Sequence, residues 1–167
     1  LKVTRGDLYR ENELNRIGEL STTRQIRSAA NTLKMSDVVS LDTPADKLTG
    51  KQAHTLGQPL TGAVFDIVVE LYLDRLVAFG LVHPSLAEGL RRAAAEHRLE
   101  AANDQPLVDA YDREPEGFAA ALGDARDMVG LRLAEAFHRL NAADLTFDRF
   151  ARTVLDGREL PVGAVTA

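Results

Sequence analysis

Histidine is the side chain that most often carries proton transfer or metal binding near neutral pH, and this chain has four of them. They are His54, His83, His97 and His138, and there is no cysteine. Zinc sites without cysteine normally need at least two histidines, as in His-Glu-x-x-His, where both ligands lie one helical turn apart beside a general base. No pair of histidines here has that spacing. We therefore expect no self-contained zinc site and no complete catalytic site in this chain.

Each histidine has a structural and a functional interpretation. His54 precedes the most apolar segment, so it is either an idle loop residue or a hydrogen-bonding group at the rim of a cleft, where helix N–H groups point the same way. His83 precedes Pro84 and is typical of a helix cap or a surface residue. His97 lies on an apolar stripe, which favours a core or interface histidine, and His138 is expected to be solvated.

Carboxylates recur every four residues at Asp66, Glu70 and Asp74, which places them in one line on a predicted helix. This line is either the single solvated edge of a central helix or a polar line facing a cleft, in which Asp66 anchors a neighbouring residue. Nothing nearby supplies the turn geometry of a calcium loop. The sequence also lacks the glycine pattern of a phosphate-binding loop and the nucleophile elbow of a serine hydrolase.

Hydrophobic periodicity predicts an all-α fold, a compact bundle of five to six helices around a central apolar helix at about 61–79. Asp7 is expected to cap the first helix, and Gln105-Pro106 to break the fourth. The apolar stripe of the fifth helix includes Phe118 and Phe137. No alternating pattern predicts a sheet. The predicted helices cover about 8–20, 22–34, 61–79, 84–103, 115–140 and 144–156, and a long loop covers about 36–57.

Composition limits the class of protein and its partners. The 167 residues are 45% hydrophobic and 27% charged, which fits a single helical domain spanning 1–167. A net charge of -5 argues against nucleic acid as a partner. No segment has the roughly 20 apolar residues of a membrane span, and the absence of cysteine and of a signal peptide favours a cytoplasmic location. Because the sequence begins at Leu1, we expect a fragment of a larger protein.

Four short segments together resemble a known family. The longest is His54-Thr-Leu-Gly-Gln-Pro-Leu-Thr-Gly-Ala-Val-Phe-Asp66, followed by an apolar helix. It resembles a segment of thermolysin-like zinc metallopeptidases, the gluzincins, and looks closest to a bacterial branch of predicted metallopeptidases. Thr4-Arg-Gly-Asp-Leu8, His83-Pro-Ser-Leu86 and Asp144-Leu-Thr-Phe-Asp-Arg-Phe150 resemble further segments of that branch in the same order, the last with differences near its end.

The resemblance implies that this chain is the C-terminal helical part of such an enzyme. In gluzincins, zinc is held by the two histidines of His-Glu-x-x-His and a downstream glutamate, all in the half that precedes the region matched here. The helical half forms the other wall of a peptide-binding cleft and contributes a histidine that hydrogen-bonds the oxyanion of the tetrahedral intermediate. By position that role falls on His54. Asp66 matches an aspartate of that branch to which the resemblance assigns no role, and it is a candidate supporting residue. The implied partners are the zinc-binding half and a peptide substrate.

A non-catalytic function is the alternative. The chain could be a helical protein-interaction module, or the remnant of a pseudoenzyme whose zinc half has decayed. In either case the wall left bare by the absent half should be an apolar patch larger than monomers normally expose, and it could bind a protein partner or form an oligomer.

Overall fold

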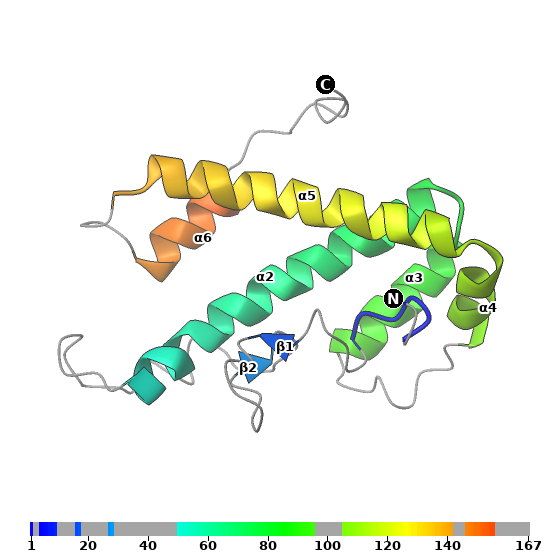
Figure 1. The fold of residues 1–167 in the computed structure, drawn as a ribbon, viewed down its shortest axis with the longest axis horizontal. Helices are drawn as coiled ribbons and strands as arrows, with labels where there is room; N and C mark the ends of the chain where they lie inside the picture. The colour runs from blue at the N-terminus through cyan, green and yellow to red at the C-terminus, as the bar shows by residue number, and fades with distance from the viewer. Residues whose placement is uncertain are drawn as a thin grey trace. The chain divides into compact units, whose positions relative to one another are not determined.

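The computed structural model describes residues 1, 4–9, 16–17, 27–28, 50–95, 105–141 and 146–155. These ranges contain five helices, so the all-α class is confirmed (Figure 1). The elements are β1 (Arg16–Ile17), β2 (Arg27–Ser28), α2 (Gly50–Ala78), α3 (Pro84–Ala95), α4 (Gln105–Arg113), α5 (Pro115–Arg139) and α6 (Phe147–Leu155). No helix within these ranges is long and apolar enough to cross a membrane.

The N-terminal part differs from the prediction wherever it is described. Strands β1 and β2 pair antiparallel, with Arg16 opposite Ser28 and Ile17 opposite Arg27, so the helices predicted at 8–20 and 22–34 are wrong at these four residues. Two-residue strands are too short to leave an alternating pattern in the sequence. Asp7 does accept a backbone hydrogen bond, from the N–H of Tyr9 at 2.8 Å, but the bond closes a local turn instead of capping a helix.

Helix α2 begins at Gly50, well before the start near 61 that the sequence predicted, and its end at Ala78 agrees with the prediction. Residues 50–57 of the expected loop are therefore helical, and residues 36–49 lie outside the described ranges. Pro59 is inside the helix, where its missing N–H removes one helix hydrogen bond. The Thr61 hydroxyl donates to the Gly57 carbonyl at 3.0 Å beside it. Gly50, Gly57 and Pro59 are residue types typical of loops, yet all three belong to this helix.

Helix α4 was missed, because Gln105-Pro106 starts a helix where the sequence predicted a break. Proline is well tolerated in the first turn, where the missing N–H has no partner to lose. Leu107, Ala110 and Tyr111 follow at helical spacing and are buried. Helices α5 and α6 match their predicted positions, and α3 matches as far as Ala95, after which residues 96–104 lie outside the described ranges.

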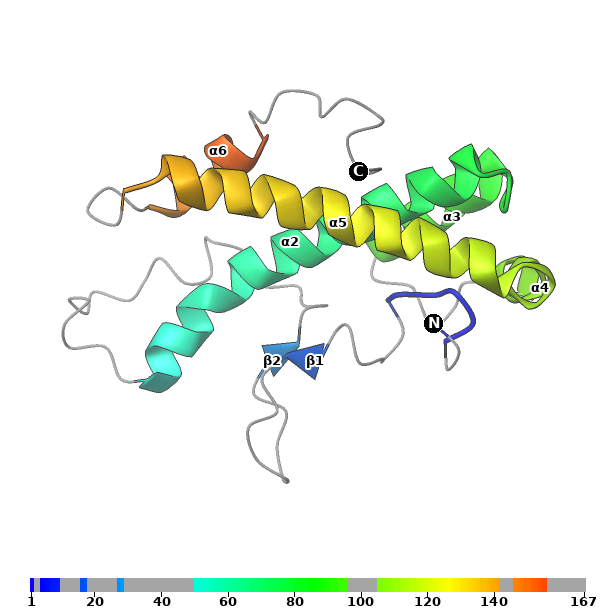
Figure 2. The same ribbon diagram turned by 45° about the horizontal axis from the view of Figure 1, so that its top comes forward.

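The contacts divide the chain into two compact units, Leu1–Ala125 and Arg126–Ala167. The core of the first unit joins α2, α3, α4, the first turns of α5 and the segment at residues 4–9, which runs beside α4 and the start of α5 (Figure 2). Phe118 is at its centre, with edge-to-face contacts to Tyr72 and Tyr111 at ring distances of 6.4 and 5.4 Å. The largest fully buried side chains are Tyr72, Phe118, Leu76, Leu107 and Val69.

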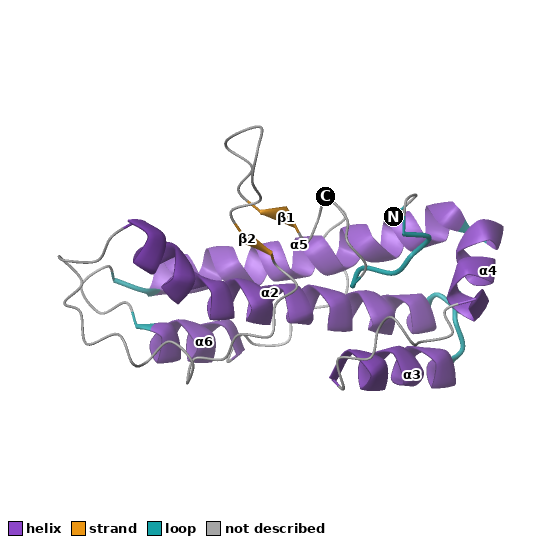
Figure 3. Cartoon of the chain, turned by 90° about the horizontal axis from the view of Figure 1, so that it is seen from below, coloured by secondary structure: helices purple, strands orange, loops and turns teal. Residues whose placement is uncertain are grey.

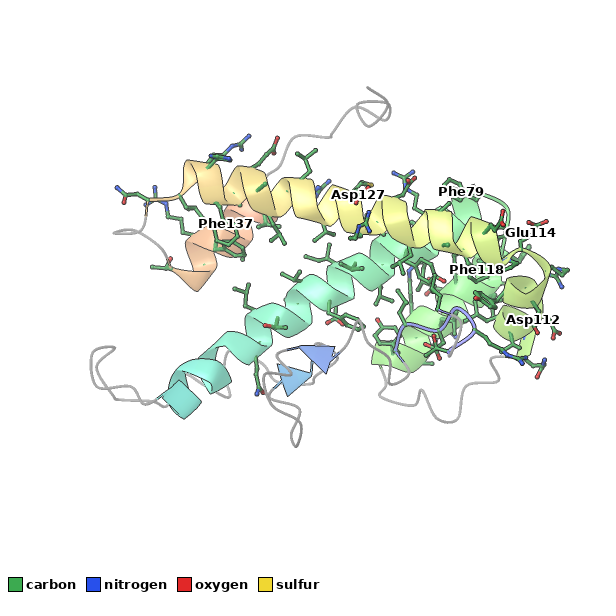
Figure 4. All side chains as sticks on the ribbon, viewed as in Figure 1. Phe79, Asp112, Glu114, Phe118, Asp127 and Phe137 are labelled. Carbon is green, nitrogen blue, oxygen red and sulfur yellow. The ribbon has the colours of Figure 1, made fainter. Side chains whose placement is uncertain are left out.

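The second unit contains the last turns of α5 and helix α6, drawn as helices in Figure 3. Its buried apolar side chains are Val129, Ala136, Phe150 and Val154. Phe137 contacts Phe150 at a ring distance of 5.3 Å but is 61% exposed, although it belongs to the predicted apolar stripe (Figure 4). This unit therefore covers its apolar face less completely than the first.

Candidate functional site

His54, the predicted catalytic residue, lies in the second turn of α2. The sequence predicted a loop at this position, so the structure corrects its backbone setting from loop to helix. The described side chains of α2 begin at Gly57, and the position of the imidazole therefore falls outside them. The catalytic role of His54 stays a prediction.

Asp66, the predicted supporting residue, belongs to the same helix as His54 and follows it by twelve positions. At a rise of 1.5 Å per residue, a straight helix separates the two backbones by about 18 Å. They therefore do not meet in one hydrogen-bonded group. Any support from Asp66 would have to act on other residues.

Asp66 is an exposed residue whose charge acts on Tyr9 of the N-terminal segment. The ring of Tyr9 packs edge-to-face on Phe65, the residue before Asp66, at 6.1 Å. Burial, with further contributions from the negative charges of Asp66, Glu70 and Asp7, raises the pKa of Tyr9 to about 12. The Tyr9 phenol therefore keeps its proton at neutral pH.

Glu70 and Asp74, the other two carboxylates of the line on α2, form ion pairs with an arginine of the next helix. Arg91 on α3 donates from Nε to Glu70 at 2.6 Å and from a terminal nitrogen to Asp74. The hydrogen bond to Glu70 is the largest cause of a raised pKa of Arg91. The Arg91 side chain is only 25% exposed, while both carboxylates lie toward solvent. The line is thus a solvated edge that joins α2 to α3.

The segment at residues 4–8 is packed into the first unit with a close backbone approach. Arg5 and Gly6 both have positive φ angles, of 46° and 90°. The phenol of Tyr72 donates to the Gly6 carbonyl at 3.0 Å, and a Cβ atom on Gly6 would lie 2.7 Å from the ring of Phe118. Burial, and next the charge of Asp7, raises the pKa of Tyr72. Sequence patterns gave no sign of this packing, which depends on residues more than sixty positions apart.

A groove of about 420 Å³ lies between the start of α3 and one face of α4, and no sequence pattern indicated it. Its polar lining residues are His83, Ser85 and Arg113, and all three are exposed. The carbonyl of His83 accepts from the N–H groups of Leu86 and Ala87, so His83 does cap α3. Among the parts of the chain that the structure describes, no group of three or more histidines and carboxylates is arranged to hold a metal ion.

The predicted positions of the other histidines have mixed outcomes. His138 is exposed at the end of α5, as expected, and His97 lies outside the described residues.

Comparison with known proteins adds no assignment, because the chain matches no family model, no curated protein and no solved structure.

Proposed function

We propose that this chain is the C-terminal helical subdomain of a gluzincin-like zinc metallopeptidase, in which it forms one wall of the peptide-binding cleft. The observation that carries the proposal is the collinear order of the four segments that resemble this family. Three of them, Thr4–Leu8, His54–Asp66 and His83–Leu86, belong to a single compact unit. Segments that share one packed unit are more informative together than as isolated short matches.

Contacts within that unit also join the elements that contain these three segments. Gly6 of the first segment accepts from Tyr72 of α2, the helix that contains the second segment. The third segment starts α3, whose Arg91 binds Glu70 and Asp74 of α2. A chain that keeps this order therefore keeps the helices in a defined mutual arrangement, as one wall of a cleft requires.

The chemistry proposed for this chain is limited to one residue. Zinc bound by the preceding half would supply the activated water and polarise the scissile carbonyl. His54 would donate a hydrogen bond to the oxyanion, an interaction that becomes strong only as negative charge develops in the transition state. Asp66 would act only indirectly, through the effect of its charge on Tyr9.

The test uses the natural full-length protein that contains this chain, assayed for peptide hydrolysis with zinc bound. His54→Ala should lower kcat by about 10²–10³-fold with little change in zinc content, because the residue stabilises the transition state and does not bind metal. His138→Ala, an exposed histidine at the end of α5, is the matched control and should leave kcat unchanged. Unchanged turnover in His54→Ala would remove this residue from the mechanism, and a full-length protein without a His-Glu-x-x-His motif would contradict the proposal itself.

A second candidate, a non-catalytic module that binds a protein partner, is favoured by exposed apolar side chains. Phe79 is 45% exposed, Leu131 41% and Phe137 61%. Large apolar residues at the surface are common singly, so their number alone decides little. If the chain binds a protein partner through these side chains, Phe137→Ser should abolish the association, which a size measurement of the full-length protein detects. If the chain is part of a metallopeptidase, the same exchange should leave peptidase activity intact.

A further inference from the structure

We propose that the groove between the start of α3 and one face of α4 binds a small organic carboxylate with an apolar body. Its volume of about 420 Å³ falls within the range of small-molecule sites, and its lining combines an apolar floor with a few polar groups. The proposal concerns residues other than His54 and Asp66. It is therefore independent of the peptidase assignment.

The charge of the groove selects an anion. Among the described residues that line the groove, Arg113 is the one charged side chain and none is a carboxylate. Within the described ranges no ion pair involves Arg113, which is exposed. Two carboxylates of the same helix already bind other partners: Asp109 accepts from Gln105 at 2.7 Å, and Asp112 pairs with Arg5 at 3.1 Å. The guanidinium of Arg113 thus keeps its donors for a carboxylate, which it can bind through two parallel hydrogen bonds.

His83 adds a donor whose direction of hydrogen bonding follows from its own contacts. Its Nδ1 atom accepts from the backbone N–H of Ser85 at 3.3 Å and lies 2.7 Å from the Ser85 hydroxyl. A backbone N–H can only donate, so Nδ1 acts as the acceptor and Nε2 is the ring nitrogen that carries the N–H. Nε2–H has no partner among the described residues, and it is a second donor suited to a carboxylate oxygen.

The floor of the groove selects the rest of the ligand. Val82 and Ala110 are buried, and Leu86 is half-buried beside them. These side chains bring no polar atom to the cavity, so an aliphatic or aromatic body gains by leaving water there. A highly charged ligand, such as a nucleotide, would meet too few donors for its phosphates. The combination of one guanidinium and an apolar floor fits a monocarboxylate.

The probe is octanoate, titrated below its micellar concentration into the complete chain and followed by NMR. A ligand of about ten non-hydrogen atoms that uses a shallow groove is expected to bind with a Kd on the order of 1–10 mM. Octan-1-ol has the same chain without the charge and should bind several-fold more weakly. The largest shifts should fall on the backbone amides of residues 82–87 and 107–113.

Arg113→Gln should weaken octanoate binding by about tenfold, because it removes a charge-assisted pair of hydrogen bonds. Arg113→Lys keeps the charge and should restore part of the affinity. Arg92→Gln is the matched control: Arg92 is also exposed, lies on α3 and does not line the groove, so the affinity should stay unchanged.

Three results would each overturn the proposal. Equal binding of octanoate and octan-1-ol would show apolar adsorption without recognition of the carboxylate, and this comparison uses the unaltered chain, so it stands even if a variant fails to fold. Equal loss in Arg92→Gln and Arg113→Gln would show a general effect of charge. Shifts centred on the second unit would place the site elsewhere.

Discussion

Helix α5 belongs to both units, and its two halves are buried to very different degrees. In the first half, Phe118, Ala121 and Ala125 are completely buried. In the second half, Val129 and Ala136 are buried, while Leu131 and Phe137 remain 41% and 61% exposed. A single apolar period runs through the whole helix, so periodicity alone does not decide how well each residue is covered.

The difference between the halves comes from the elements that pack on them. In the first unit, α5 meets residues that are distant in the sequence, such as Tyr72 on α2 and Gly6 at the N-terminus, and Tyr111 from α4. In the second unit, the aromatic contact of α5 is with Phe150 on the next helix. We therefore expect long-range packing to dominate the stability of the first unit, and the second to unfold more easily.

The largest expected effect is the loss of the aromatic ring at the centre of the first unit. Phe118→Ala should lower the free energy of unfolding by about 3–5 kcal/mol, because it removes a fully buried ring and leaves a cavity between Tyr72 and Tyr111. Phe137→Ala on the same helix should cost less than about 1.5 kcal/mol, since its ring is mostly exposed. Chemical denaturation followed by circular dichroism measures both values. Equal losses would contradict the contrast between the two halves of α5.

The next effect tests whether the N-terminal segment is part of the core. Gly6→Ala places a Cβ atom 2.7 Å from the Phe118 ring and forces an alanine to a φ of 90°, so we expect a loss of about 1–3 kcal/mol in the free energy of unfolding. The control is Gly80→Ala, which has a φ of 69° but open space around the new methyl group. Its cost should be about 1 kcal/mol, from backbone strain alone. If both variants lose the same amount, the crowding at Phe118 is unimportant.

A smaller effect separates the hydrogen bond of Tyr72 from its ring packing. Tyr72→Phe keeps the ring and removes the donor to the Gly6 carbonyl, which should cost about 1 kcal/mol near neutral pH. Burial raises the pKa of the Tyr72 phenol in the folded chain. As the pH rises, the phenol therefore loses its proton first in the unfolded chain, near pH 10. Stability should therefore hold below about pH 10 and fall above it, by up to about 1.4 kcal/mol per pH unit for this group. In Tyr72→Phe the decline should be shallower, with the contribution of Tyr9 remaining, and denaturation series from pH 8 to about 11 test this.

These contacts also explain which features the sequence could predict. Helices α5 and α6 follow from apolar residues at helical spacing within one segment, and such local patterns survive in any fold. The packing of Gly6 against Phe118 depends on residues over a hundred positions apart, and no local pattern encodes it. Helix α4 has a local signal in Leu107, Ala110 and Tyr111, but Pro106 is typical of a helix break in the sequence, whereas in the structure it occupies a first-turn position.

The candidate site was less predictable than the fold for a related reason. The family resemblance points to His54 and Asp66, but the early start of α2 puts them on one continuous helix, where they cannot converge. The groove around Arg113 joins the start of α3 to one face of α4, and the sequence did not predict α4. A site that depends on such a junction becomes visible only when both elements are known.

The smallest expected effect concerns the ion pairs between α2 and α3. Arg91→Gln removes the hydrogen bonds to Glu70 and Asp74, whose carboxylates are largely exposed, so the loss should be about 0.5–1 kcal/mol. Added salt screens exposed pairs, and the difference between the variant and the unaltered chain should shrink between 0.05 and about 1 M NaCl. Arg126→Gln is the control in the second unit and should cost close to nothing, because among the described residues Arg126 pairs only with its exposed neighbour Asp127. A salt-independent loss above about 2 kcal/mol for Arg91→Gln would show that the arginine stem, packed at 25% exposure, contributes more than its charge. Arg91 would then stabilise the contact between α2 and α3 through packing and not through its charge.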